Sequence, residues 1–136
     1  MNGISPVRFK TQGRVLSGLG RGAQFLSIGW VRSELRDRLG FDPFPGTLNL
    51  KIDPDLWNTI YSNRDSLLKI SDPASSTCPG FLKRVRLQAG KERSCFAYLI
   101  LPELTMYKDV LEIVAPESLR EKLGLQDGDA VTIEDA

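Results

Sequence analysis

Thr47 and Asn49 follow a Pro-Gly turn and stand two residues apart in a segment that alternates like a strand. Residues two apart in an extended chain point to the same side, so a hydroxyl and an amide oxygen are presented together. Oxygen ligands of this kind suit Mg²⁺, whose remaining positions substrate phosphates and water can fill. Taken alone, however, the spacing favours the simpler interpretation of a turn that Thr and Asn commonly follow.

A glycine-rich segment at residues 17–22, Ser-Gly-Leu-Gly-Arg-Gly, is the second candidate. Glycines let a backbone approach a phosphate closely, and successive N–H groups can form an anion-binding nest. The spacing matches neither the dinucleotide-binding pattern GxGxxG nor the P-loop pattern GxxxxGK[ST]. By itself the segment therefore favours a flexible turn between strands.

Weaker candidates lie toward the C-terminus. Thr105 and Glu112 could bind the polar edge of a ligand or orient a hydroxyl for phosphorylation, or they could belong to a connecting loop and a solvent-facing strand. Residues 116–120 begin a predicted helix whose free N–H groups favour an anion, with Arg120 nearby, although an ordinary amphipathic helix is the usual case. The five basic residues within 83–93 are expected to line the solvated face of two strands.

Composition removes several classes of function. The 136 residues include no histidine, which excludes Ser/His/Asp and Cys/His catalysis and most zinc sites. Lys and Arg number 18 against 17 Asp and Glu, so the basic excess typical of a nucleic-acid binder is missing. No apolar stretch approaches a membrane span, and the first residues lack signal-peptide character. We expect a cytoplasmic monomer or weak homodimer with no nucleic-acid or membrane partner.

Hydrophobic periodicity predicts the elements that must position these residues. Strands are expected over 7–15, 48–52, 81–87, 95–101, 110–114 and 130–133. Helices are expected over 31–39 before Gly40, from Pro54 behind an Asp53 N-cap, and from Pro116 to a stop at Gly124. Residues 62–80 are expected to form a long surface loop or lid. The predicted fold class is β-rich α+β, a small closed or partly closed barrel with short peripheral helices.

Motifs in a fixed order carry a resemblance to a known family. They are GRV at 13–15, SGLGxG at 17–22, LGFxPFxGTLN at 39–49, LEIVAP at 111–116, LR at 119–120 and LxDGD at 125–129. Over nearly the whole chain the sequence resembles the archaeal-type, CTP-dependent riboflavin kinases. The resemblance implies one riboflavin kinase-like domain over 1–136, a six-stranded cradle-loop barrel, and the conversion of riboflavin and CTP to FMN and CDP with Mg²⁺.

The resemblance also implies a role for each candidate residue. Thr47 and Asn49 would ligate Mg²⁺, and Thr105 and Glu112 would contact the flavin. The implied nucleotide-binding residues are Leu19, Gly20, Arg21, Gly22, Ala23, Gln24, Glu117, Ser118, Leu119 and Arg120. No catalytic base is assigned, because phosphoryl transfer depends mainly on positioning and charge neutralisation.

Two other functions fit parts of the sequence. Residues 115–125, followed by Asp-Gly-Asp at 127–129, are similar to the repeat of swapped-hairpin transition-state regulators, which bind DNA. Neither the glycine-rich segment nor the Gly-Thr-Leu-Asn motif is expected in those proteins, which favours the kinase. A homologue that binds flavin or nucleotide without catalysis is the other alternative, because Arg21 stands where the family often carries Glu and residues 105–112 are one residue shorter than usual.

Overall fold

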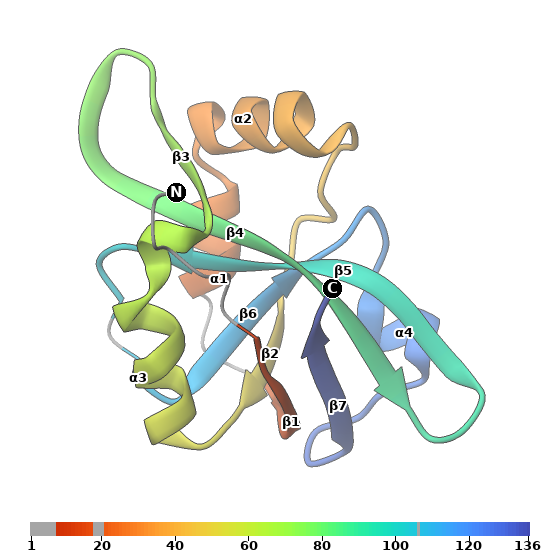
Figure 1. Ribbon diagram of the computed structural model, residues 1–136. Helices are drawn as coiled ribbons and strands as arrows, with labels where there is room; N and C mark the ends of the chain where they lie inside the picture. The colour runs from red at the N-terminus through yellow and green to blue at the C-terminus, as the bar shows by residue number, and fades with distance from the viewer. Residues whose placement is uncertain (1–7, 18–20, 106) are drawn as a thin grey trace.

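Six antiparallel strands form a closed barrel in the computed structural model, which describes residues 8–17, 21–105 and 107–136 (Figure 1). The strands are β1 (Lys10–Leu16), β2 (Leu48–Lys51), β4 (Ser75–Ala89), β5 (Arg93–Pro102), β6 (Val110–Val114) and β7 (Ala130–Asp135). Their order is β4-β5-β6-β2-β1-β7, and pairing of β4 with β7 closes the ring. A seventh strand, β3 (Leu68–Asp72), pairs with β4 outside the ring. The predicted fold class is confirmed.

Short helices surround the barrel, as Figure 1 shows. They are α1 (Arg21–Leu26), α2 (Gly29–Leu39), α3 (Pro54–Ser62), α4 (Leu119–Leu123) and a single 3₁₀ turn, η1 (Arg64–Ser66). In the figure α2 lies beside the β3–β4 hairpin at the top of the molecule, while α3 and α4 lie on opposite sides of the barrel. Across the parts of the chain that the structure describes, no helix is both long and apolar enough to cross a membrane.

Local capping signals in the sequence set the ends of α2 and α3 as expected. Gly40 ends α2 with φ of 79°, a left-handed conformation that glycine adopts without steric cost, and its N–H donates to the Arg36 carbonyl. Asp53 accepts a hydrogen bond from the N–H of Asp55 at 3.0 Å, and Pro54 opens α3. These caps fix where the chain enters and leaves the helices around β2.

Three local predictions were wrong. Residues 62–80 form η1, β3 and the start of β4 rather than a loop or lid, because Ile70 is fully buried and anchors β3. The last helix begins at Leu119 and not at Pro116, because Ser118 keeps an extended backbone and its Oγ caps the N–H of Glu121. The glycine-rich segment leads directly into α1 at Arg21, where a loop was expected through residue 22.

Two apolar clusters hold the fold together. The larger fills the barrel and includes residues of α3 and α4, with the Trp57 Nε1–H donating to the Val110 carbonyl at 3.0 Å. The smaller lies between the outer face of the sheet and the α1–α2 pair. It consists of Leu26, Val31, Leu35, Ile70, Leu82, Ile100 and Val114. The α1–α2 pair is therefore held on the barrel by apolar packing, to which β3 contributes Ile70.

Ile70→Ala tests whether residues 62–80 are packed structure. Removing a fully buried isoleucine from the smaller cluster should lower the free energy of unfolding by about 2–5 kcal/mol, as large-to-small core substitutions do. The exposed neighbour Lys69 is the matched control, and Lys69→Ala should change stability by less than about 0.5 kcal/mol. Urea denaturation measures both. Equal stability of the two variants would restore the interpretation as a loosely attached lid.

Candidate functional site

Thr47 and Asn49 lie together at the start of β2. The Thr47 Oγ1–H donates to Asn49 Oδ1 at 3.1 Å. Asn49 is only 8% exposed, and among the described residues it is the one buried residue with a polar side chain. The β2–β6 register places Asn49 directly opposite Glu112. Burying an amide costs free energy unless its polar atoms have partners, so this position requires specific interactions.

The separation of these two oxygens fits a magnesium ion. Mg²⁺ binds six oxygens at about 2.0–2.1 Å in an octahedron, which puts neighbouring ligand oxygens about 3.0 Å apart. Both ligands are neutral, and the described residues hold no cluster of three or more acidic, histidine or cysteine side chains. Charge neutralisation at this point would therefore need anionic oxygens from a ligand, as phosphates provide.

A pocket beside Thr47 contains the predicted nucleotide-binding residues of the C-terminal segment, 117–120. The Phe44 N–H donates to the Ala115 carbonyl at 2.8 Å, which joins the segment before β2 to the end of β6. The pocket is lined by Phe44, Gly46, Thr47, Leu48, Ala115, Glu117, Ser118, Leu119 and Arg120. All four predicted residues of 117–120 therefore share one pocket with the predicted metal ligand.

These four residues differ in what they can offer a ligand. The Leu119 side chain is 5% exposed and packs into the barrel cluster, so the backbone is its accessible part. Glu117 pairs with Lys122 at 3.2 Å, and Ser118 Oγ caps α4. Arg120 is partly exposed and is the basic residue among those that line the pocket. An anionic ligand in this pocket would be met chiefly by Arg120.

Arg120 is held by residues that the sequence analysis did not select. Its Nη2 donates to the Leu16 carbonyl at 3.0 Å and to Asp127 Oδ1 at 2.6 Å, while the Ser17 Oγ–H donates to Asp127 Oδ2 at 2.6 Å. The hydrogen bond from Ser17, and then that from Arg120, lowers the pKa of Asp127. The sequence held one indication of this contact: Asp127 belongs to the family motif LxDGD, and the sequence analysis gave it no role.

A second pocket contains both residues of the flavin prediction. It is lined by Gln24, Phe25, Ile28, Pro102, Leu104, Thr105 and Glu112. Thr105 exchanges hydrogen bonds of 3.4 Å with the backbone of Tyr107, which orients its hydroxyl within the loop. The lining includes exposed apolar side chains, with Ile28 at 42% and Leu104 at 73%. Sequence reasoning missed this apolar wall, because exposed apolar residues in loops carry no periodic signal.

The Thr47–Asn49 pair lies between the two pockets. Thr47 lines the first pocket, and Asn49 stands opposite Glu112, which lines the second. Gln24, predicted to bind nucleotide, lies on α1 and lines the second pocket. Leu19 and Gly20 lie outside the described residues, as do the side chains of Arg21 and Ala23. Gly22 falls within α1. The roles of residues 19–23 remain predictions.

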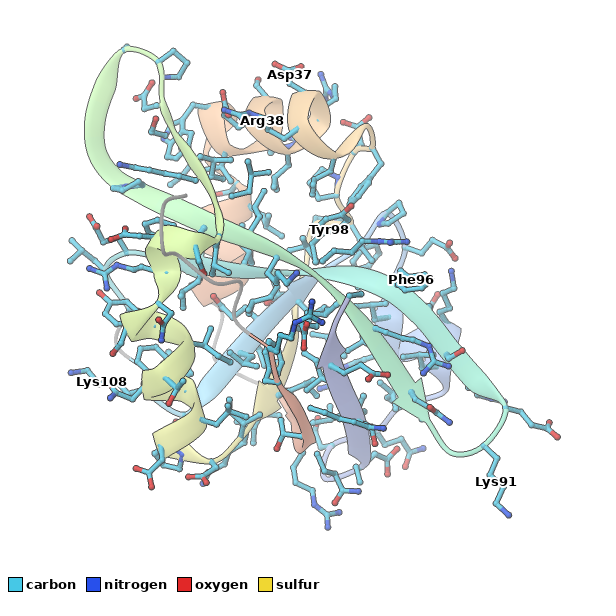
Figure 2. All side chains as sticks on the ribbon, in the orientation of Figure 1. Asp37, Arg38, Lys91, Phe96, Tyr98 and Lys108 are labelled. Atoms are coloured by element: carbon cyan, nitrogen blue, oxygen red, sulfur yellow. The ribbon has the colours of Figure 1, made fainter. Side chains whose placement is uncertain are left out.

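The basic residues of β4 line neither of the two pockets described above. Arg84 stacks on the exposed ring of Phe96, with its guanidinium carbon 4.0 Å from the ring centroid, and Arg86 pairs with Glu134 at 3.3 Å. Figure 2 shows Phe96 and Tyr98 along β5, and neither lines either of the two pockets. This agrees with the expected solvated face of two strands.

Comparisons with known proteins converge on one group. The matching family model is CTP-dep_RFKase, described as a domain of unknown function, DUF120, and it covers residues 15–134. A riboflavin kinase of Pyrobaculum islandicum is 42% identical over 127 residues, which are 92% of this chain and 59% of that protein. A riboflavin kinase of Archaeoglobus fulgidus is 36% identical over 92% of this chain and 54% of its own length. A riboflavin kinase of Saccharolobus solfataricus is 39% identical over 90% of this chain and 71% of its own length.

The chain spans 58–59% of the length of the Pyrobaculum relatives that match it first. The family match nevertheless extends over nearly all of this chain, including both pockets and the Thr47–Asn49 pair. The resemblance seen in the sequence motifs is confirmed. On this match and these identities, the chain belongs to the CTP-dep_RFKase family.

Proposed function

We propose that this domain transfers the γ-phosphate of CTP to the 5′-hydroxyl of riboflavin, giving FMN and CDP. The observation that carries the proposal is the position of Thr47 and Asn49 between two pockets of different character. Phosphoryl transfer needs a donor and an acceptor on opposite sides of one phosphate-holding point. The relatives are named riboflavin kinases, which supports riboflavin as the substrate, and the family name supports CTP as the donor.

The pocket beside Thr47 would take the nucleotide. Its cation is Arg120, which can neutralise phosphate charge through charge-assisted hydrogen bonds. The oxygens of Thr47 and Asn49 would hold Mg²⁺, which would offset charge on the terminal phosphates when bound. Neutral protein ligands suit this task, because the phosphates already carry the negative charge.

The pocket beside Glu112 would take riboflavin. Phe25, Ile28 and Leu104 provide an apolar wall that a flat ring system can cover. Glu112 sits across the strand pair from Asn49, where side chains of an antiparallel pair lie about 5 Å apart at Cβ. A hydroxyl held by the Glu112 carboxylate would therefore lie close to the phosphate-holding point. Positioning of this kind accounts for much of the rate of phosphoryl transfer.

The phosphate donor is tested by incubating the protein with riboflavin and Mg²⁺ and with CTP, UTP, GTP or ATP in parallel. We expect FMN, separated by chromatography, to form fastest with CTP. Faster FMN formation from ATP would support riboflavin kinase activity but refute CTP as the preferred phosphate donor. Folded protein that binds riboflavin by fluorescence titration but forms no FMN with any donor would instead identify a binding protein without catalysis.

Thr47→Val and Asn49→Leu test the metal ligands with little change in side-chain size. Each variant loses one oxygen, so we expect kcat to fall about 100-fold, the range seen when one charge-stabilising contact in a transition state is lost. Thr47→Ser keeps the hydroxyl and should retain most activity. The measurement is the rate of FMN formation as a function of Mg²⁺ concentration, with circular dichroism to verify folding. Full turnover by both variants would refute the metal assignment.

A further inference from the structure

Asp127 connects two parts of the proposed nucleotide site from outside the pocket. It lies in the turn between α4 and β7. Its Oδ1 accepts a hydrogen bond from Arg120 Nη2 and its Oδ2 accepts one from the Ser17 Oγ–H, each at 2.6 Å. The same Nη2 donates to the Leu16 carbonyl at 3.0 Å. One carboxylate thus joins the end of β1 to the helix that carries Arg120.

Of the two joined elements, the helix that carries Arg120 borders the nucleotide pocket. Arg120 lines that pocket together with Thr47, and Ser17 is the first residue of the glycine-rich segment. The guanidinium of Arg120 is a rigid plane with five N–H donors, and its bonds to Leu16 and Asp127 both use Nη2. Fixing one nitrogen of a planar group restricts the direction of the others. The bridge therefore sets how Arg120 faces an anion in the pocket.

The bridge contributes orientation more than stability. The side chains of Arg120 and Asp127 are 34% and 59% exposed, and ion pairs this exposed add little to the free energy of folding. The hydrogen bond from Ser17, followed by that from Arg120, lowers the pKa of Asp127, so the carboxylate keeps its charge at a lower pH than an ordinary aspartate does. A charged acceptor makes the stronger hydrogen bond to a guanidinium.

The turn itself is held by other contacts. Asp129 Oδ2 accepts from the Gln126 N–H at 2.8 Å, and the Asp129 carbonyl accepts from the Val15 N–H at 3.0 Å. The Gly128 N–H donates to the Val15 carbonyl at 2.9 Å. These bonds do not involve the Asp127 side chain. Losing its charge should therefore leave the turn and the barrel in place.

We propose that Asp127 is a positioning residue for nucleotide binding: it holds the Arg120 guanidinium toward the phosphates, and Ser17 fixes the direction of its carboxylate. The inference rests on the proposed function, since that assigns the pocket beside Thr47 to the nucleotide. Asp127 acts through Arg120 and lies outside the riboflavin pocket. Its loss therefore weakens nucleotide binding and leaves riboflavin binding as it was.

Asp127→Asn is compared with Asp129→Asn, which removes the same charge from the same turn. The control variant retains a side-chain oxygen that can accept from the Gln126 N–H, and it leaves the contacts of Arg120 and Ser17 with Asp127 unchanged. Calorimetric titration with CTP and Mg²⁺ gives the nucleotide Kd, and FMN formation gives KM for each substrate. We expect Asp127→Asn to raise Kd and KM for CTP about tenfold, the usual effect of losing one charged hydrogen-bond partner, with KM for riboflavin unchanged. Asp129→Asn should keep the wild-type values.

A double-mutant cycle separates positioning from a general structural effect. In an Arg120→Ala background, Asp127→Asn should have little further effect on the CTP Kd, because residues that act through one contact are not additive. An additive effect in that background, or equal CTP affinity of Asp127→Asn and wild type, would overturn the inference. Wild-type protein that binds no CTP would overturn the proposed function itself, and the two failures are thereby distinguishable.

Discussion

The register of β2 between β1 and β6 decides which side chains reach the proposed site. Leu48 and Leu50 point into the barrel cluster, opposite Ile113 and Leu111, so the intervening Asn49 must point outward. A slip of one residue would put the amide among the aliphatic side chains and the leucines outside. Burial of these four apolar side chains therefore fixes the direction in which Asn49 points. The leucines thus stabilise the proposed site, although they take no part in its chemistry.

Strand pairing explains how distant parts of the chain lie side by side. Pairing of β1 with β7 brings the turn before β7 beside the end of β1, and pairing of β4 with β7 completes the ring. Ser17 and Asp127 meet across 110 residues of sequence, and Arg120 reaches Leu16 across 104. These contacts therefore depend on the same strand pairings that hold the fold.

The absence of histidine is compatible with the proposed chemistry. Neutral oxygens at Thr47 and Asn49, one cation at Arg120 and a carboxylate at Glu112 can position a phosphate and a hydroxyl without a base that titrates near neutrality. Both pockets mix polar and apolar side chains. The first contains the cation Arg120, and the second contains the carboxylate of Glu112 beside the apolar side chains of Phe25, Ile28 and Leu104.

Local signals in the sequence determined the six barrel strands and the caps at Asp53 and Gly40. These follow from residue type and short-range spacing, where alternation, proline and glycine act within a few residues. The family was determined by the order of motifs along nearly the whole chain, and only that resemblance singled out Thr47 and Asn49. Tertiary structure alone decided that β3 packs through Ile70, that Leu119 turns inward, and that α1 covers the apolar pocket. It alone joined Ser17, Arg120 and Asp127. Those outcomes depend on which surfaces the folded barrel brings together. The residues in contact are far apart in sequence, so no local sequence pattern predicts that they meet.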